Sequence, residues 1–180
     1  NSAAMYQFRH DFFIRKNPVR HSFTYRGLHL HIPDLTIPLP GDHQKENVSL
    51  ALAACELIFD RNTKTDPCPP LTPALVKKGL GMAKWPGRLE IIQKKPLVIL
   101  DGAHNLKAAQ VLGRYLAATL AGKKLTLVVG ILDDKPYEAM LKYLLPSAHR
   151  VIITRAKIDR SLPTHVLAAD AKKNFSGTIQ

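Results

Sequence analysis

The second half of the chain alternates short apolar runs with amphipathic stretches. Apolar runs at 97–100, 125–132 and 151–154 predict strands, and the stretches at 105–120, 136–145 and 164–173 predict helices. The helix at 105–120 is expected to bury Ala108, Leu112, Tyr115 and Leu116. Repeated strand–helix units favour a parallel sheet with right-handed crossovers, so we expect an α/β domain here.

The first forty residues predict short strands. Runs at 22–25 and 28–32 are separated by Arg26 and Gly27, a pattern typical of a β-hairpin. His29 and His31 would share one face of the second strand. A solvent-facing hairpin surface is the favoured interpretation of that pair, and a metal site is the alternative.

Two helices are predicted next. The first begins at Gly41 and runs to about Phe59, with other apolar residues around its remaining faces, so we expect it to be well buried. Its expected buried stripe consists of Val48, Ala51, Leu52, Cys55 and Ile58. A proline-rich loop is expected at 62–70. The second helix begins with Thr72 as N-cap and Pro73 at its first position, and ends near Gly79 or Gly81.

A strand-to-helix junction is the strongest candidate site in the chain. The apolar run at 97–100 ends in Asp101, and His104 and Asn105 precede the next helix. In open α/β sheets ligands bind beyond the carboxyl ends of the strands. The first N–H groups of a helix and its dipole favour anions. Asp101 and His104 are therefore candidates for handling a phosphate or a carboxylate.

Composition narrows the function classes. The net charge is +12 and the sequence pI is about 9.9, but Lys and Arg are scattered without a basic run. A basic enzyme surface is therefore favoured over nucleic-acid binding. Cys55 and Cys68 lack metal or redox spacing, which indicates a reducing, cytoplasmic compartment. The chain has no run of about 18 apolar residues, so no membrane span is predicted. The chain begins with Asn1 rather than Met, which suits a fragment or a processed chain.

Three sequence boxes carry a family resemblance. They are Leu-Pro-Gly-Asp-His-Gln-Lys-Glu-Asn at 39–47, Trp-Pro-Gly-Arg-Leu-Glu at 85–90 and Asp-Gly-Ala-His-Asn at 101–105. Their order and spacing resemble the dihydrofolate synthase / folylpolyglutamate synthase family, a branch of the Mur ligase superfamily. The resemblance implies that residues 1–87 are the tail of a P-loop ATPase-type central domain. Residues 88–180 would be an incomplete Rossmann-like C-terminal α/β domain.

The resemblance also implies an activity. Such an enzyme uses ATP to add L-glutamate to dihydropteroate and/or folates through an acyl phosphate. The family's phosphate loop and Mg²⁺ ligands lie in an N-terminal part that no segment here matches, so this chain alone is expected to be inactive and to supply no metal ligand. The implied protein is cytoplasmic and monomeric, without nucleic-acid or membrane partners.

Residue roles follow from the same boxes. Gln44 and Asn47 would bind the nucleotide, with Asn47 at its base, and Arg88 would reach the ATP phosphates across the domain cleft. Asp101 and His104 are the implied catalytic pair, and Asp101 would also contact ATP.

The remaining candidate residues are Asn105 and Lys135, which would bind substrate. Leu106 and Pro136 depart from the family pattern at two helix starts. A Mur-type ligase of cell-wall precursors, which Gly102 argues against, and a non-catalytic nucleotide-binding module stay open as alternatives.

Overall fold

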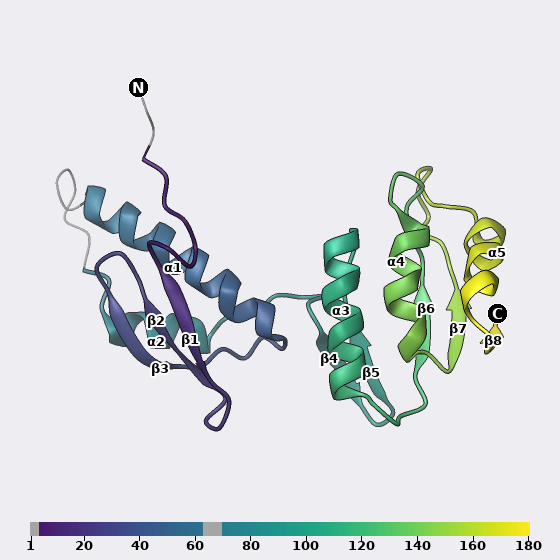
Figure 1. Ribbon diagram of the computed structural model, residues 1–180, viewed down its shortest axis with the longest axis horizontal. Coiled ribbons are helices and arrows are strands. Elements are labelled where there is room, and N and C mark those ends of the chain that lie inside the picture. Colours follow the sequence, from purple (N-terminus) through teal and green to yellow (C-terminus); the bar gives the residue numbers. More distant parts are fainter. Residues whose placement is uncertain (1–3, 63–69) are drawn as a thin grey trace. The chain divides into compact units, whose positions relative to one another are not determined.

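The computed structural model describes residues 4–62 and 70–180 (Figure 1). The chain divides into two compact units that meet in the sequence between Asp101 and Gly102. The domain boundary near Arg88 stays a prediction. Most of the loop expected at 62–70, including Cys68, lies outside the described residues. Within the described part, no helix is both long and apolar enough to cross a membrane.

The first unit begins with a three-stranded antiparallel sheet. Its strands are β1 (Phe13–Asn17), β2 (Ser22–Arg26) and β3 (His31–Leu35), in the order β1-β2-β3. The predicted hairpin is confirmed, but its second strand begins at His31. His29 therefore lies in the connecting turn, and the expectation that it shares a strand face with His31 is wrong.

Two helices, α1 (Asp42–Asn62) and α2 (Pro73–Gly81), supply residues to the core beside this sheet. The core cluster consists of Phe12, Phe23, Tyr25, Ile32, Leu35, Val48, Leu52, Ala53 and Val76. The start of α2 is confirmed, since the Thr72 hydroxyl accepts a hydrogen bond from the Leu75 amide at 3.2 Å.

The predicted buried stripe of α1 is partly wrong. Val48 and Leu52 are buried, whereas Ala51 and Ile58 are exposed, and Leu50 is also exposed, so the helix is not buried all round. The buried face instead includes Gln44, Ser49 and Glu56. Polar residues are buried here because they have hydrogen-bond partners, which apolar periodicity alone does not reveal.

Glu56 is a buried carboxylate that ties α1 to the turn between β2 and β3. It accepts hydrogen bonds from the Tyr25 hydroxyl at 2.6 Å, the His29 amide at 2.6 Å and the Leu30 amide at 2.9 Å. A Cβ at Gly27 would collide with the Glu56 Oε1 atom. The carboxylate therefore replaces the strand partners that the turn amides lack.

The first unit ends in a two-stranded antiparallel ribbon of β4 (Glu90–Lys94) and β5 (Leu97–Leu100). The bounds of β5 are as predicted. The expectation that 97–100 joins the parallel sheet is wrong, because its partner is β4, which adjoins it through a two-residue connection. Strands joined by so short a connection can pair antiparallel, whereas parallel pairing needs a long crossover.

The second unit contains the expected parallel sheet. Its elements are α3 (Leu106–Thr119), β6 (Thr126–Val129), α4 (Tyr137–Leu144), a 3₁₀ turn η1 (Leu145–Ser147), β7 (Arg150–Ile153), α5 (Thr164–Asn174) and β8 (Thr178–Ile179). The strand order is β6-β7-β8, with parallel pairing throughout. The short strand β8 was not predicted from the sequence.

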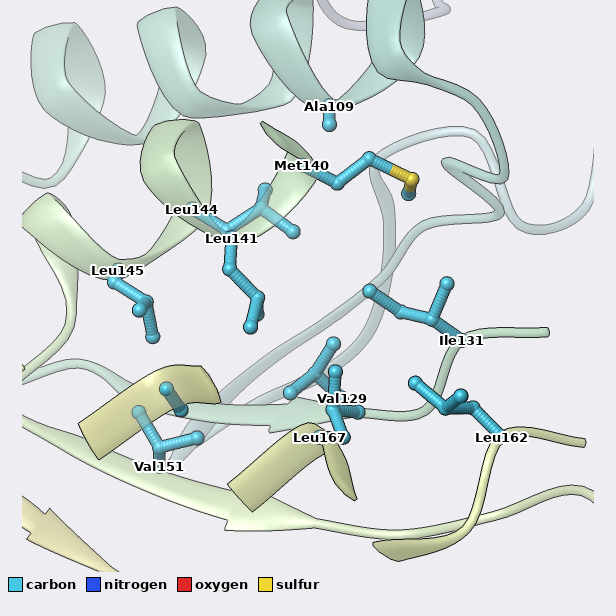
Figure 2. Packing of buried hydrophobic residues seen from close by; sticks show 11 residues of the cluster. Ala109, Val129, Ile131, Met140, Leu141, Leu144, Leu145, Val151, Leu162 and Leu167 are labelled. Carbon is cyan, nitrogen blue, oxygen red and sulfur yellow. The ribbon is translucent and has the colours of Figure 1, made fainter. Parts of the chain in front are cut away.

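Helices and strands of the second unit enclose one apolar core, shown in Figure 2. Met140 and Leu141 of α4 lie within it, together with Val151 of β7. The buried residues of α3 are Ala109, Gly113 and Leu116, so the predicted stripe is rotated and only Leu116 is common to both. Gly113 is needed there because a Cβ would collide with the Tyr143 carbonyl oxygen.

Replacing Glu56 by Ala should destabilise the first unit. It leaves the His29 and Leu30 amides without their acceptor, which we expect to lower the free energy of unfolding by about 2–4 kcal/mol. Tyr25→Phe removes one of these bonds and should cost about 1 kcal/mol. Urea unfolding followed by circular dichroism measures both values.

Glu46→Ala is the matched control, because Glu46 is a partly exposed residue of the same helix with a 3.6 Å ion pair to Arg9. It should change the free energy by no more than about 0.5 kcal/mol. Equal effects at positions 46 and 56 would show that the buried carboxylate has no special role.

Candidate functional site

A short loop before β4 presents Arg88 between two anchored backbone positions. Gly87 and Leu89 both have positive φ, at 67° and 50°. The Gly87 amide donates to Glu90 Oε2 at 2.8 Å, and the Leu89 amide donates to Asp101 Oδ2 at 2.9 Å. Leu89 is also buried. Because left-handed backbone is costly for leucine, the Asp101 contact and this burial stabilise the loop that carries Arg88.

The box before α1 packs against the same loop. Gly41 has φ of 95°, and a Cβ there would lie 2.6 Å from His43 Cε1 and 3.3 Å from Leu89 Cδ1. Glycine is therefore required at this turn for both its conformation and its space. The turn brings the first box and the Arg88 box together, although they are far apart in the sequence.

His43 lies in the electrostatic field of two predicted site residues. Burial lowers its pKa below the usual 6.5, while the Asp101 carboxylate raises it and the Arg88 guanidinium lowers it. His43, Arg88 and Asp101 thus share one environment. No role of its own was predicted for His43 from the sequence, and its place near Arg88 was missed because no local pattern signals it.

Gln44 and Asn47 lie together near the start of α1. Gln44 is buried, and its Oε1 accepts a hydrogen bond at 3.1 Å from the Nδ2 of exposed Asn47. This bond assigns the amide orientation of Asn47 and points its Oδ1 away from Gln44. Asn47 therefore offers an acceptor to a ligand, and its predicted contact with a nucleotide base stays a prediction.

A pocket adjoins Arg88 within the first unit. It has a volume of about 370 Å³. Its lining residues are Pro38, Leu39, Pro40, Ala83, Lys84, Trp85, Pro86, Arg88, Leu89, Glu90 and Ile91. Apolar walls with a few charged groups are typical of small-molecule sites, and the exposed Trp85 ring adds a flat apolar surface.

His104 and Asn105 belong to the second unit and precede α3. The His104 Nδ1 lies 2.9 Å from the Gly102 carbonyl oxygen, which can only accept, so Nδ1 carries the proton. In the neutral ring Nε2 is then left as an acceptor. Asn105 is the N-cap of α3, and its Oδ1 accepts from the Ala108 amide at 2.8 Å.

Lys135 is engaged locally. Its Nζ lies 2.7 Å from Asp134 Oδ2, and Arg160 reaches the same oxygen at 3.7 Å. No hydrogen bond or ion pair joins Lys135 to His104 or Asn105 in the described part of the chain. Its substrate-binding role stays a prediction. Among the described residues, no cluster of three or more His, Cys, Asp or Glu side chains fits a metal ion.

Comparisons with known proteins identify the family of the chain. The sequence pattern described as "Mur ligase, glutamate ligase domain" matches residues 87–179, which is more than half of the chain. The chain belongs to this Mur ligase family. The match begins at the Arg88 loop and includes Asp101, His104, Asn105 and Lys135.

Curated relatives carry the names that the boxes predicted. The chain is 32% identical over 153 residues to the dihydrofolate synthase/folylpolyglutamate synthase of Bacillus subtilis, covering 83% of this chain and 34% of the relative. It is 38% identical over 118 residues to the folylpolyglutamate synthase of Lacticaseibacillus casei, covering 66% and 26%. The chain therefore spans about a third or less of the length of these relatives.

Solved structures extend the likeness over nearly the whole chain. Mycobacterium tuberculosis folylpolyglutamate synthase complexed with ADP aligns with a TM-score of 0.79 and 30% identity, covering 95% of this chain and 38% of that one. The Thermotoga maritima folylpolyglutamate synthase aligns with a TM-score of 0.75 and 35% identity, covering 98% and 41%. The predicted fold class and family resemblance are confirmed, while the roles of individual residues are not tested by these matches.

Two substitutions should move the His43 pKa in opposite directions. Asp101→Asn removes a charge that favours the imidazolium, so the pKa should fall further below 6.5, whereas Arg88→Gln should raise it. Because the folded-state pKa is depressed, His43 contributes stability that is present above pH 6.5 and lost as the pH falls, since the unfolded state binds the proton more readily.

An NMR titration of the His43 ring in the unchanged chain and in the Asp101→Asn and Arg88→Gln variants measures these pKa shifts. Arg114→Gln, an exposed arginine on α3 of the second unit, serves as the charge-matched control and should leave the His43 pKa unchanged. Shifts of the same sign in the Asp101 and Arg88 variants would contradict the shared environment.

Proposed function

We propose that this chain is part of an ATP-dependent ligase that adds L-glutamate to dihydropteroate and/or folates. The observation that carries the proposal is the convergence of the first box, the Arg88 loop and Asp101 beside a pocket. Such a site has a cation for phosphate and an apolar wall for a base. The names of the curated relatives, and the ADP in the Mycobacterium tuberculosis structure, support the choice of reaction and nucleotide.

The proposed reaction balances as a phosphoryl transfer followed by an acyl transfer. The pterin-bearing substrate's carboxylate attacks the γ-phosphorus of ATP, forming an acyl phosphate and releasing ADP. The amine of L-glutamate then attacks the acyl carbon, the C–O bond to phosphate breaks, and an amide and inorganic phosphate result. The amine must lose a proton during this second step.

The residues of this chain fit complementary roles in that reaction. The Arg88 guanidinium would hold phosphate oxygens, and Asn47, oriented by Gln44, would accept a hydrogen bond from the base. Asp101 would hold the Arg88 loop and attract a cationic amine or contact the nucleotide. The Nε2 of neutral His104 would accept a hydrogen bond from the ammonium group of glutamate and help to position it.

Magnesium would supply charge neutralisation to the transferring phosphoryl group when it is bound. The family resemblance implies that its ligands belong to an N-terminal part that no segment of this chain matches, so we assign it to no residue here. Solved structures of the Mycobacterium tuberculosis relative with ADP and AMPPCP are in keeping with a nucleoside triphosphate substrate. A cytoplasmic, monomeric parent protein completes the proposal.

A chimera tests the proposed function. It joins the N-terminal part of the Bacillus subtilis relative to this chain, replacing the segment that matches. The chimera should incorporate glutamate in the presence of ATP and a folate, whereas the 180-residue chain alone should not. ATP-dependent addition of an amino acid to a nucleotide–sugar precursor, but not to a folate, would instead support a Mur-type cell-wall ligase, and nucleotide binding without either reaction would support a non-catalytic module.

Within the chimera, Arg88→Ala should lower kcat and raise the KM for ATP. Loss of one contact to a transferring phosphoryl group typically costs about a hundredfold in rate. Arg88→Lys keeps the charge but loses the planar fork, so its kcat and KM should lie between those of the unchanged chimera and of Arg88→Ala. Arg114→Ala, an exposed arginine, is the control. Unchanged ATP kinetics in Arg88→Ala would return Arg88 to a structural role.

A further inference from the structure

A second pocket lies on the sheet β1-β2-β3, away from the residues that line the Arg88 pocket. It has a volume of about 340 Å³ and is lined by Phe13, Arg15, Thr24, Arg26 and His31. It shares no lining residue with the first pocket. Four of its five residues are exposed, and Thr24 is partly buried. None of them has a role in the proposed reaction.

The strand register places these residues in two adjacent rows. Arg26 lies opposite Phe13 on one side and opposite His31 on the other, and Arg15 lies opposite Thr24. The alternate positions of β2, Phe23 and Tyr25, are buried in the core. Side chains alternate between the two faces of a strand, so all five lining residues are on the outer face of the sheet.

This outer face has uncompensated positive charge. Two other cations close in the sequence have acidic partners, since Arg20 pairs with Asp34 at 3.7 Å and Lys16 pairs with Asp42 at 3.1 Å. Within the described residues, neither Arg15 nor Arg26 forms an ion pair. No acid lines the pocket, so the charge of these two arginines is not balanced within it. An anion from outside the chain would balance this charge.

The separation of Arg15 and Arg26 indicates what kind of ligand fits. Arg15 and Arg26 are diagonal neighbours across β1 and β2, a relation that separates positions by about 7–8 Å. Two guanidinium forks at that spacing suit two anionic groups on one molecule, since each fork matches a phosphate or a carboxylate. The partly exposed Phe13 ring lies beside them as an apolar contact, and the Thr24 hydroxyl adds a donor.

We propose that this pocket binds a small organic ligand that carries two or more phosphate or carboxylate groups. Arg15 and Arg26 each bind one group, His31 adds a hydrogen bond next to Arg26, and Phe13 contacts the apolar part of the ligand. The proposal goes beyond the ligase reaction and does not depend on it.

Binding to the full 180-residue chain tests the proposal at an ionic strength of about 0.15 M, where weak surface attraction is screened. The probes are inorganic tripolyphosphate and a tri-γ-glutamate peptide, which separate phosphate from carboxylate ligands. At least one should bind saturably in calorimetry and shift the NMR amide signals of Phe13 and Thr24. The double variant Arg15→Gln/Arg26→Gln should weaken that binding at least about tenfold, because two charge-assisted contacts are lost.

Two control variants locate the effect. Arg9→Gln/Arg20→Gln removes the same charge from two arginines that already have acidic partners, and it should leave binding unchanged. Arg114→Gln, which changes an exposed arginine of α3 that lines neither pocket, should also leave binding unchanged. Thermal melting should be alike in all variants, since every changed residue in the two double variants is exposed.

Three results would overturn the proposal. One is the absence of saturable binding by either probe. Another is an equal loss in the two double variants, which would indicate attraction by net charge alone. The third is binding only to a single-stranded oligonucleotide with affinity that rises with its length, which would make the surface a nucleic-acid platform.

Discussion

The hydrogen bond from the Leu89 amide to the Asp101 carboxylate is the contact on which the candidate site depends. It joins the end of β5 to the loop that carries Arg88, at 2.9 Å, and it stabilises a leucine with positive φ. A carboxylate that accepts a backbone N–H is a charge-assisted acceptor, stronger than a neutral one. Asp101 therefore has a structural task in addition to any contact with a ligand, and the position of Arg88 follows from it.

Other parts of the first unit support this arrangement from a distance. The glycine turn at Gly41 leaves room for His43 and Leu89 together, so α1 begins beside the Arg88 loop. The far half of α1 is fixed by Glu56, whose carboxylate holds the turn between β2 and β3. Glu56 and Asp101 therefore both act as acceptors for backbone N–H groups. Glu56 holds the far half of α1, and Asp101 holds the loop beside which α1 begins.

Local signals made much of the fold predictable from the sequence. The N-cap Thr72 with Pro73 and the apolar run of β5 each depend on neighbours in the chain, and the structure has those elements as expected. Which strands pair with each other was harder to predict from the sequence. β5 pairs with β4 rather than with the parallel strands, and β8 has only two residues, so its identity as a strand comes from its neighbour β7.

The candidate site was likewise predictable only in part. The resemblance marked Arg88, Asp101 and His104, but periodicity misplaced the buried face of α1, because Glu56 and Gln44 are buried as hydrogen-bonded polar groups. His43 escaped notice because its environment comes from residues in two other boxes. A side chain whose neighbours are distant in the sequence leaves no periodic pattern, and only the folded chain reveals it.

A double-mutant cycle on Arg88 and Asp101 in the active chimera tests the central dependence most directly. It compares kcat/KM for ATP in Arg88→Ala, Asp101→Ala and the combined variant, with a melting curve for each protein. If Asp101 acts by holding the Arg88 loop, the combined loss should be close to that of Arg88→Ala alone, because one bound geometry is lost in each case. Losses that multiply, with unchanged melting, would contradict the account and show that the two residues act independently.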